Sequence, residues 1–157
     1  DQRNIRFLEQ FRGGGSLIIA AISSAPLLLG KAGLLEGRRF THGVFEEFLD
    51  AFPVMPRAGM VRTYLVEDGN LITAYSGAFR EFAAAVGRRV GLDCPDAIFS
   101  DMSGKTWTEE DFIFHLPPEL LEEARAFWDS CIEAEKSRPR RAHGCRQAVP
   151  PSAPGRW

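Results

Sequence analysis

The sequence predicts an α/β protein built on a parallel β-sheet with helices packed against it. Short apolar segments alternate with segments of helical periodicity over residues 1–92, which is the order that produces a parallel sheet covered by helices. The chain has 157 residues, of which 45% are hydrophobic and 25% charged, enough for one globular domain with its own core. Its longest apolar run, residues 17–22, is far shorter than the roughly 18 residues that a membrane-spanning helix needs. We therefore expect a protein that does not enter the membrane.

The first part of this body is predicted to run helix, strand, helix. Apolar residues recur at helical spacing in residues 4–11, and three consecutive glycines then end the predicted helix. Residues 17–22, L-I-I-A-A-I, form a continuous apolar run, which is typical of a strand covered on both faces. Residues 26–33 are predicted to be a short helix, because Pro26 suits a first turn, where its missing N–H costs nothing.

The second part of the body is predicted to contain three more strands and one clear helix. The strands are residues 39–41, 60–66 and 71–75. A turn is indicated by Asp68-Gly69-Asn70, and residues 44–52 are predicted to be helical or irregular. Residues 76–90 have the periodicity of an amphipathic helix. The side chains that this helix is predicted to bury are Phe79, Phe82, Ala83 and Val86.

Residues 93–136 are predicted to form a helical extension that packs on the body. Thr108 resembles a helix N-cap, and the acidic residues 109–111 that follow it suit the positive end of a helix dipole. A longer helix is predicted over residues 118–136. Its apolar stripe consists of Leu120, Leu121, Ala124, Phe127, Trp128, Cys131 and Ile132. We favour packing of this stripe on the body, and a dimer interface is the alternative.

Charge is distributed unevenly along the chain. All 21 acidic residues precede residue 136, whereas residues 136–157 contain six of the 19 Lys and Arg residues. Residues 137–157 are rich in Pro, Gly, Ala and Arg and poor in large aliphatic residues, so we predict a disordered basic tail. An arm that binds nucleic acid is the alternative to a solvated tail, and we favour the solvated tail. Neither nucleic acid nor a membrane is therefore an expected partner.

The cysteines indicate a reducing compartment. Cys94, Cys131 and Cys145 are odd in number and have no C-x-x-C spacing, so we predict free thiols and a cytoplasmic protein. The three histidines lie too far apart in the sequence to form a recognisable metal motif with them. We expect neither a metal ion nor another cofactor.

The stretch I-I-A-A-I-S-S-A-P, residues 18–26, could carry a nucleophile. A sharp turn from a strand into a helix strains its central residue and requires small residues two positions before and after it. Ala21 and Ala25 meet this requirement if Ser23 is the central residue. The N–H of Ser24 could then stabilise an oxyanion beside the Ser23 hydroxyl. A plain strand end that happens to be rich in small residues is the alternative.

Two separated blocks of the sequence also carry a family resemblance. They are L-I-I-A-A-I-S-S-A-P-L-L-L-G-K-A-G-L-L-E-G-R-R-F-T-H and N-L-I-T-A-Y-S-G-A-F-R-E-F-A. Both blocks resemble the ThiJ/PfpI family of the class I glutamine amidotransferase-like superfamily, which includes the Parkinsonism-associated protein deglycase. The resemblance implies that residues 1–92 are the C-terminal portion of such a domain, with a partial flavodoxin-like sheet. In the family, a glutamate and a Gly-rich loop that serve the nucleophile precede the region matching Asp1, so the resemblance implies a fragment.

The resemblance also implies which residues form the site. The position of the family's cysteine nucleophile is occupied by Ser23, and Ser24 and Ala25 complete the elbow. A serine hydroxyl is almost wholly un-ionised at neutral pH and reacts slowly unless a base lies beside it. His42 matches a histidine near the nucleophile of many members and could be that base, whereas a histidine that merely ends a strand is the alternative.

The predicted function is therefore that of a ThiJ/PfpI-like protein with weak or no catalysis, acting as a binding or regulatory module. A serine-based hydrolase or amidase, or a deglycase-like enzyme, that uses Ser23 and His42 is the alternative. The partners that these predictions leave open are a small-molecule ligand at the elbow and a second copy of the chain.

Overall fold

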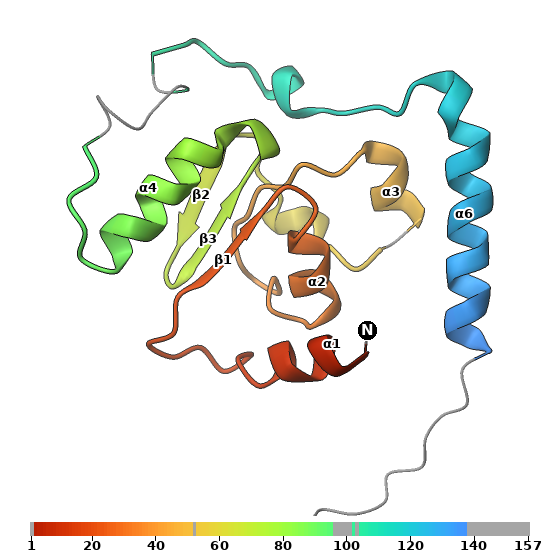
Figure 1. Cartoon of the computed structure of the whole chain (residues 1–157), viewed down its shortest axis with the longest axis horizontal. Helices are drawn as coiled ribbons and strands as arrows, with labels where there is room; N and C mark the ends of the chain where they lie inside the picture. The colour runs from red at the N-terminus through yellow and green to blue at the C-terminus, as the bar shows by residue number, and fades with distance from the viewer. Residues whose placement is uncertain (1, 52, 96–101, 103, 138–157) are drawn as a thin grey trace, which may run out of the picture. The chain divides into compact units, whose positions relative to one another are not determined.

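A sheet of three short strands forms the centre of the body (Figure 1). The computed structural model describes residues 2–51, 53–95, 102 and 104–137. The strands are β1 (Ile19–Ile22), β2 (Leu65–Asp68) and β3 (Leu71–Ala74), in the order β1-β3-β2. β1 runs parallel to β3, with Ile22 opposite Ala74, and β2 runs antiparallel to β3. The predicted α/β class is confirmed, with a mixed sheet.

The expectation that every strand is parallel does not hold for β2. Only Gly69 and Asn70 separate β2 from β3, and a parallel pair needs a crossover of a dozen or more residues. Gly69 has a φ of 57°, the left-handed conformation that tight hairpin turns require. The predicted turn is therefore present, and it reverses the chain. The strand predicted at residues 60–66 begins later, and Met60 forms only an isolated bridge with Phe40.

Helices precede, connect and follow the strands (Figure 1). The α-helices are α1 (Gln2–Glu9), α2 (Pro26–Lys31), α3 (Glu46–Ala51), α4 (Phe79–Arg89) and α6 (Pro118–Lys136). The 3₁₀-helices are η1 (Arg57–Gly59), η2 (Ser76–Ala78) and η3 (Glu109–Phe112). All except η1 lie within or close to a segment for which the sequence predicts helical or irregular structure, and η3 follows the predicted cap, Thr108.

Two clusters of apolar side chains pack on opposite faces of the sheet. Ala21 belongs to the first cluster together with residues of α1 and α2, whereas its neighbour Ile22 packs against the second cluster. Successive side chains of a strand point to opposite faces, so the two clusters lie on different sides of β1. The second cluster contains Ala74, Ala78, Met102 and Phe112. Apolar side chains thus pack against both faces of the sheet, as in an α/β architecture.

Two predictions of burial are wrong. β1 is not fully covered, since Ala20 is exposed and Leu17, in the predicted strand, lies before β1 and is 51% exposed. In α4, Phe79 is 58% exposed and Ala83 is exposed, whereas the predicted Phe82 packs against the second cluster and Val86 is half-buried. The buried residues of α4 are Glu81, Ala84, Ala85 and Gly87. The chain enters α4 through η2, and this 3₁₀ turn changes which residues face the sheet relative to one continuous α-helix.

The chain divides into two compact units, Asp1–Glu119 and Leu120–Trp157. The helix predicted over residues 118–136 is present as α6, and its packing on the body stays a prediction. The predicted disordered tail and Cys145 lie outside the described residues, apart from Ser137. No helix that the structure describes is both long and apolar enough to cross a membrane.

Candidate functional site

Ser23 occupies the turn between β1 and α2 in a backbone conformation that is costly for a serine. Its φ is 62°, and in the described part of the chain it is the sole non-glycine residue with a positive φ. A side chain held in this left-handed region costs roughly 1 to 3 kcal/mol, and such residues persist only where the surrounding structure fixes them. The strain lies at the residue that the sequence pattern places at the centre of a sharp turn.

Two backbone hydrogen bonds hold Ser23 in place. Its N–H donates to the carbonyl of Ala74, at the end of β3, with an N–O distance of 2.9 Å. Its own carbonyl accepts the N–H of Gly43 at 2.8 Å. The turn is therefore fixed to the neighbouring parallel strand and to residues 41–45, which we call the His42 loop.

Gly43 allows the His42 loop to approach this closely. A Cβ atom on Gly43 would lie 3.2 Å from the Cα of Ser23 and 3.3 Å from the backbone nitrogen of Ser76. Contacts this short with backbone atoms would force the loop or the turn to move. Ser23 and Ser76 follow two adjacent parallel strands, so the three residues meet at the carboxyl edge of the sheet, where α/β proteins bind ligands.

Buried residues anchor the start of the His42 loop. Phe40 is fully buried in the first core cluster. The N–H of Thr41 donates to the Thr73 hydroxyl at 2.9 Å, and the Thr41 hydroxyl donates to the carbonyl of Thr63 at 2.7 Å. In the segment F-T-H, Phe40 is thus an apolar anchor, and Thr41 bonds one neighbouring segment through its N–H and another through its hydroxyl. His42 follows directly.

The residues after Ser23 offer one free backbone donor. α2 begins at Pro26, so Ser24 and Ala25 lie in the turn. The N–H of Ala25 donates to the carbonyl of Ile22 at 3.1 Å, whereas the N–H of Ser24 has no acceptor within the described residues. Of the two predicted elbow residues, Ser24 is therefore the one that could stabilise an oxyanion.

His42 is buried and already has a hydrogen bond on its ring. Its Nδ1 accepts the N–H of Val44 at 3.1 Å. A neutral imidazole has one N–H and one acceptor nitrogen, so this bond places the proton of the neutral ring on Nε2. Burial lowers the pKa of His42 to about 4, an effect that Glu46 opposes and that Arg62 and Arg57 reinforce. The ring is therefore neutral at pH 7, and its one acceptor nitrogen, Nδ1, is already occupied by the N–H of Val44.

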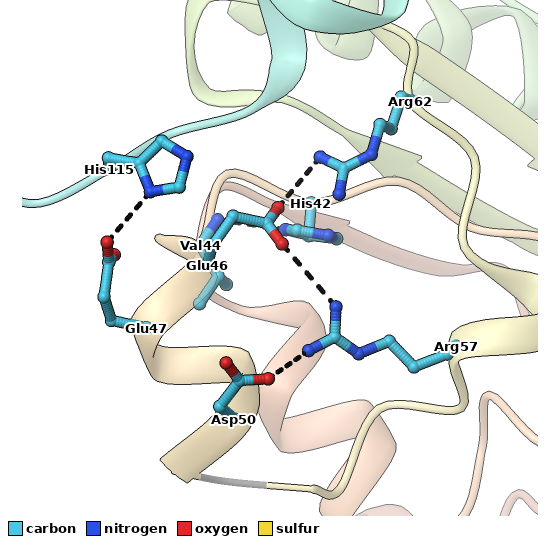
Figure 2. A network of polar contacts seen from close by, with 8 residues as sticks. All are labelled: His42, Val44, Glu46, Glu47, Asp50, Arg57, Arg62 and His115. Carbon is cyan, nitrogen blue, oxygen red and sulfur yellow. Dashed lines mark hydrogen bonds and ion pairs between the residues drawn. The ribbon is translucent and has the colours of Figure 1, made fainter.

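A carboxylate that the sequence analysis missed lies near His42. Glu46, the first residue of α3, pairs with Arg62 at 2.8 Å and with Arg57 at 3.5 Å. Figure 2 shows the two guanidinium groups converging on this carboxylate, while Arg57 also pairs with Asp50 at 2.6 Å. The hydrogen bond from Arg62 is the largest cause of a lowered pKa of Glu46.

Glu46 does not orient His42 as the carboxylate of a catalytic triad would. A triad carboxylate accepts the Nδ1–H of the histidine. Here both oxygens of Glu46 are engaged by arginines, and the Nδ1 of His42 is engaged by Val44. The local sequence contained one indication of Glu46, because an acidic pair suits the first turn of a helix. Its pairing with Arg62 could not be predicted, because the two residues are 16 positions apart.

The structure thus brings part of the predicted site together. Ser23, Ser24 and Ala25 share one turn, and the loop that carries His42 is hydrogen-bonded to that turn. The chemical roles of these residues stay predictions. Within the described residues, no three His, Cys, Asp or Glu side chains are grouped so that they could hold a metal ion.

Two solved structures resemble this chain. A ThiJ/PfpI family protein from Bacillus anthracis is 28% identical over 66% of this chain and 51% of its own, with a TM-score of 0.54. A two-domain protein from Anabaena variabilis, with a ThiJ/PfpI-like and a ferritin-like domain, is 22% identical over 84% of this chain and 45% of its own, with a TM-score of 0.50.

The chain therefore has a ThiJ/PfpI-like fold, and the resemblance found in the sequence is confirmed. It spans about half the length of the two solved chains that it matches. No model of a protein family matches the sequence, and no curated protein matches it.

Proposed function

We propose that this chain is a ThiJ/PfpI-like binding or regulatory module in which Ser23 replaces the nucleophilic cysteine and catalysis is weak or absent. The observation that carries the proposal is the hydrogen bond from the Val44 N–H to the Nδ1 of His42. It leaves the neutral ring with a proton on Nε2, so His42 cannot accept the proton of the Ser23 hydroxyl without first rearranging. A small-molecule ligand would bind at the Ser23 turn, at the carboxyl edge of the sheet.

The alternative is a serine-based hydrolase or amidase, or a deglycase-like enzyme, that uses Ser23 and His42. Two observations favour it: the strained φ of Ser23 and the free N–H of Ser24. An oxyanion donor contributes on the order of 3 kcal/mol, and a general base about 10²- to 10⁴-fold in rate. Loss of the base would leave slow turnover at most, which is why we favour the binding module.

A fluorophosphonate probe separates the two proposals, because it modifies a serine only when a base activates the hydroxyl. We expect the wild-type chain to remain unlabelled under conditions that label a reference serine hydrolase completely. Intact-protein and peptide mass spectrometry would detect the adduct. Stoichiometric labelling at Ser23 that is lost in His42→Ala, but kept in the control Ser76→Ala, would instead establish the serine hydrolase.

A second copy of the chain is the macromolecular partner that we propose, through the open edge of β1. Among the described strands, β1 pairs only with β3. The N–H groups of Ile19 and Ser23 face β3, so those of the alternate residues, Ala20 among them, face the open edge. Exposed apolar edges of this kind promote strand pairing between molecules.

Light scattering at increasing concentration should therefore show dimers or larger species of the wild-type chain. Ala20→Lys should shift the population towards monomer, because Ala20 is exposed and a charged edge opposes pairing. A wild-type chain that stays monomeric at all concentrations would refute this partner.

A further inference from the structure

Residues 107–116, which we call the strap, lie outside the two blocks that resemble a known family. Their first half is anchored in the second core cluster. Phe112 is 3% exposed in that cluster, and the Trp107 ring packs against it. Thr108 and Asp111 form a reciprocal capping box, with Asp111 accepting the Thr108 N–H at 2.7 Å. Core packing and the capping box therefore hold the first half of the strap in place.

The middle of the strap contacts the residue before Ser76. The ring of Phe114 is stacked on Tyr75, with centroids 5.0 Å apart and an interplanar angle of 8°. Phe112 meets the same tyrosine edge to face at 5.7 Å. Tyr75 is thus packed against two aromatic rings of the strap, and its neighbour Ser76 lies against Gly43 beside Ser23.

The end of the strap is joined to α3, which directly follows the His42 loop. The carbonyl of Phe114 accepts the N–H of Glu46 at 2.9 Å. The Glu47 carboxylate pairs with the Nδ1 of His115 at 2.9 Å, as Figure 2 shows, and also accepts the N–H of Leu116 at 3.3 Å. Three contacts therefore connect consecutive strap residues to the first turn of α3.

We infer that the strap is a clamp that holds the His42 loop and the Tyr75–Ser76 segment together around Ser23, with Phe114 and Glu47 as positioning residues. Phe114 contacts the Tyr75–Ser76 segment through its ring, and its carbonyl bonds Glu46, which directly follows the His42 loop. Gly43 of the His42 loop lies against both the strained turn at Ser23 and the backbone of Ser76, so it links the two segments to that turn. The clamp rests on the proposed function only in that it holds the residues around Ser23 in place. Whether it holds them does not depend on what Ser23 binds.

Hydrogen exchange measured by mass spectrometry tests the clamp directly. In Phe114→Ala, we expect exchange of peptides covering residues 42–46 to rise about tenfold, since an aromatic pair and a connecting contact are lost. Peptides covering β3 should exchange as in the wild type. Glu47→Gln should produce a smaller increase in the same peptides, and Phe114→Tyr, which keeps the stacked ring, should restore slow exchange. Glu67→Gln, which breaks the Glu67–Arg89 pair at 3.0 Å, is the matched control and should change nothing in the loop.

A second measurement asks whether the clamp acts on Ser23. In a Ser23→Cys background, the pH dependence of alkylation gives the pKa of the new thiol, and Phe114→Ala should raise that pKa and slow alkylation at neutral pH about tenfold. Unchanged exchange in residues 42–46, equal increases throughout the sheet, or an unaltered thiol pKa would overturn the inference. An ordinary thiol in the Ser23→Cys parent would count against the proposed site, while the exchange result would still decide whether the clamp exists.

Discussion

Replacing Ser23 by cysteine is expected to make position 23 the most reactive thiol of the chain. A cysteine there would have the strained backbone of the Ser23 turn and would lie beside the free N–H of Ser24. Because a hydrogen bond from a backbone N–H favours the thiolate, we expect the pKa of this thiol to fall from roughly 8.5 to about 7 or below, which raises the thiolate fraction at neutral pH about tenfold. Oxidation by mild peroxide and alkylation should therefore both be faster by about that factor at position 23.

Cys94 and Cys131 are free thiols and provide internal references for this measurement. Peptide mass spectrometry after brief treatment gives the relative rates at position 23 and at all three native cysteines, Cys94, Cys131 and Cys145, in one sample. Ser24→Cys is the matched control, because its side chain is one residue away from the strained position. Equal modification of Cys94 and the new thiol would show that the turn does not activate a nucleophile.

Gly59→Ala is expected to cause the largest loss of stability among simple substitutions near the site. A Cβ atom at Gly59 would lie 2.0 Å from the backbone oxygen of Arg38, far inside any tolerated contact. The carbonyl of Gly59 accepts the N–H of Phe40, and Phe40 is fully buried and leads into the His42 loop. An added methyl group at Gly59 would push residues 38–40 away, and this would displace both the buried Phe40 side chain and the His42 loop.

We expect Gly59→Ala to lower the free energy of unfolding by on the order of 3 kcal/mol, a loss typical of disrupted core packing. For a chain of this length, the melting temperature would fall by roughly 10 °C. Gly13→Ala is the matched control, because a Cβ there would meet nothing within 4 Å. Calorimetry of both variants would contradict the account if the two melting temperatures were the same.

The sequence predicted those features of the fold that depend on neighbouring residues. The strand before Ser23, the helix over residues 76–90 and the cap at Thr108 all follow from local patterns, and all are present, with η2 forming the first turn of that helix. The two-residue turn before β3 predicts the antiparallel direction of β2, whereas the alternation of strands and helices in the body predicted a parallel one. The position of β1 at the edge of the sheet was not predictable, because it depends on which strands lie beside it.

For the candidate site, the sequence pattern predicted the sharp turn at Ser23, whereas its longer-range contacts could not be predicted. Ser23 lies where small residues at fixed offsets placed it, in a conformation that only a sharp turn requires. The side-chain contacts around the His42 loop and the start of α3 join distant residues. Arg62 engages Glu46 across 16 positions, and His115 engages Glu47 across 68. The bond between Val44 and the ring of His42 is local, but it depends on the rotamer of a buried histidine, which no sequence pattern fixes.

In the proposed function, the protonation of His42 determines whether a base is available to Ser23, and long-range proton–nitrogen NMR of the histidine rings measures that protonation directly. The account predicts a neutral ring near pH 7 with the proton on Nε2, and a pKa of about 4. His42→Gln would assign the signals, and His115, with an exposed ring, provides a reference in the same spectrum. A proton on Nδ1, or a pKa for His42 at or above its ordinary value of roughly 6.5, would show a ring that is free to accept the Ser23 proton and would contradict the account.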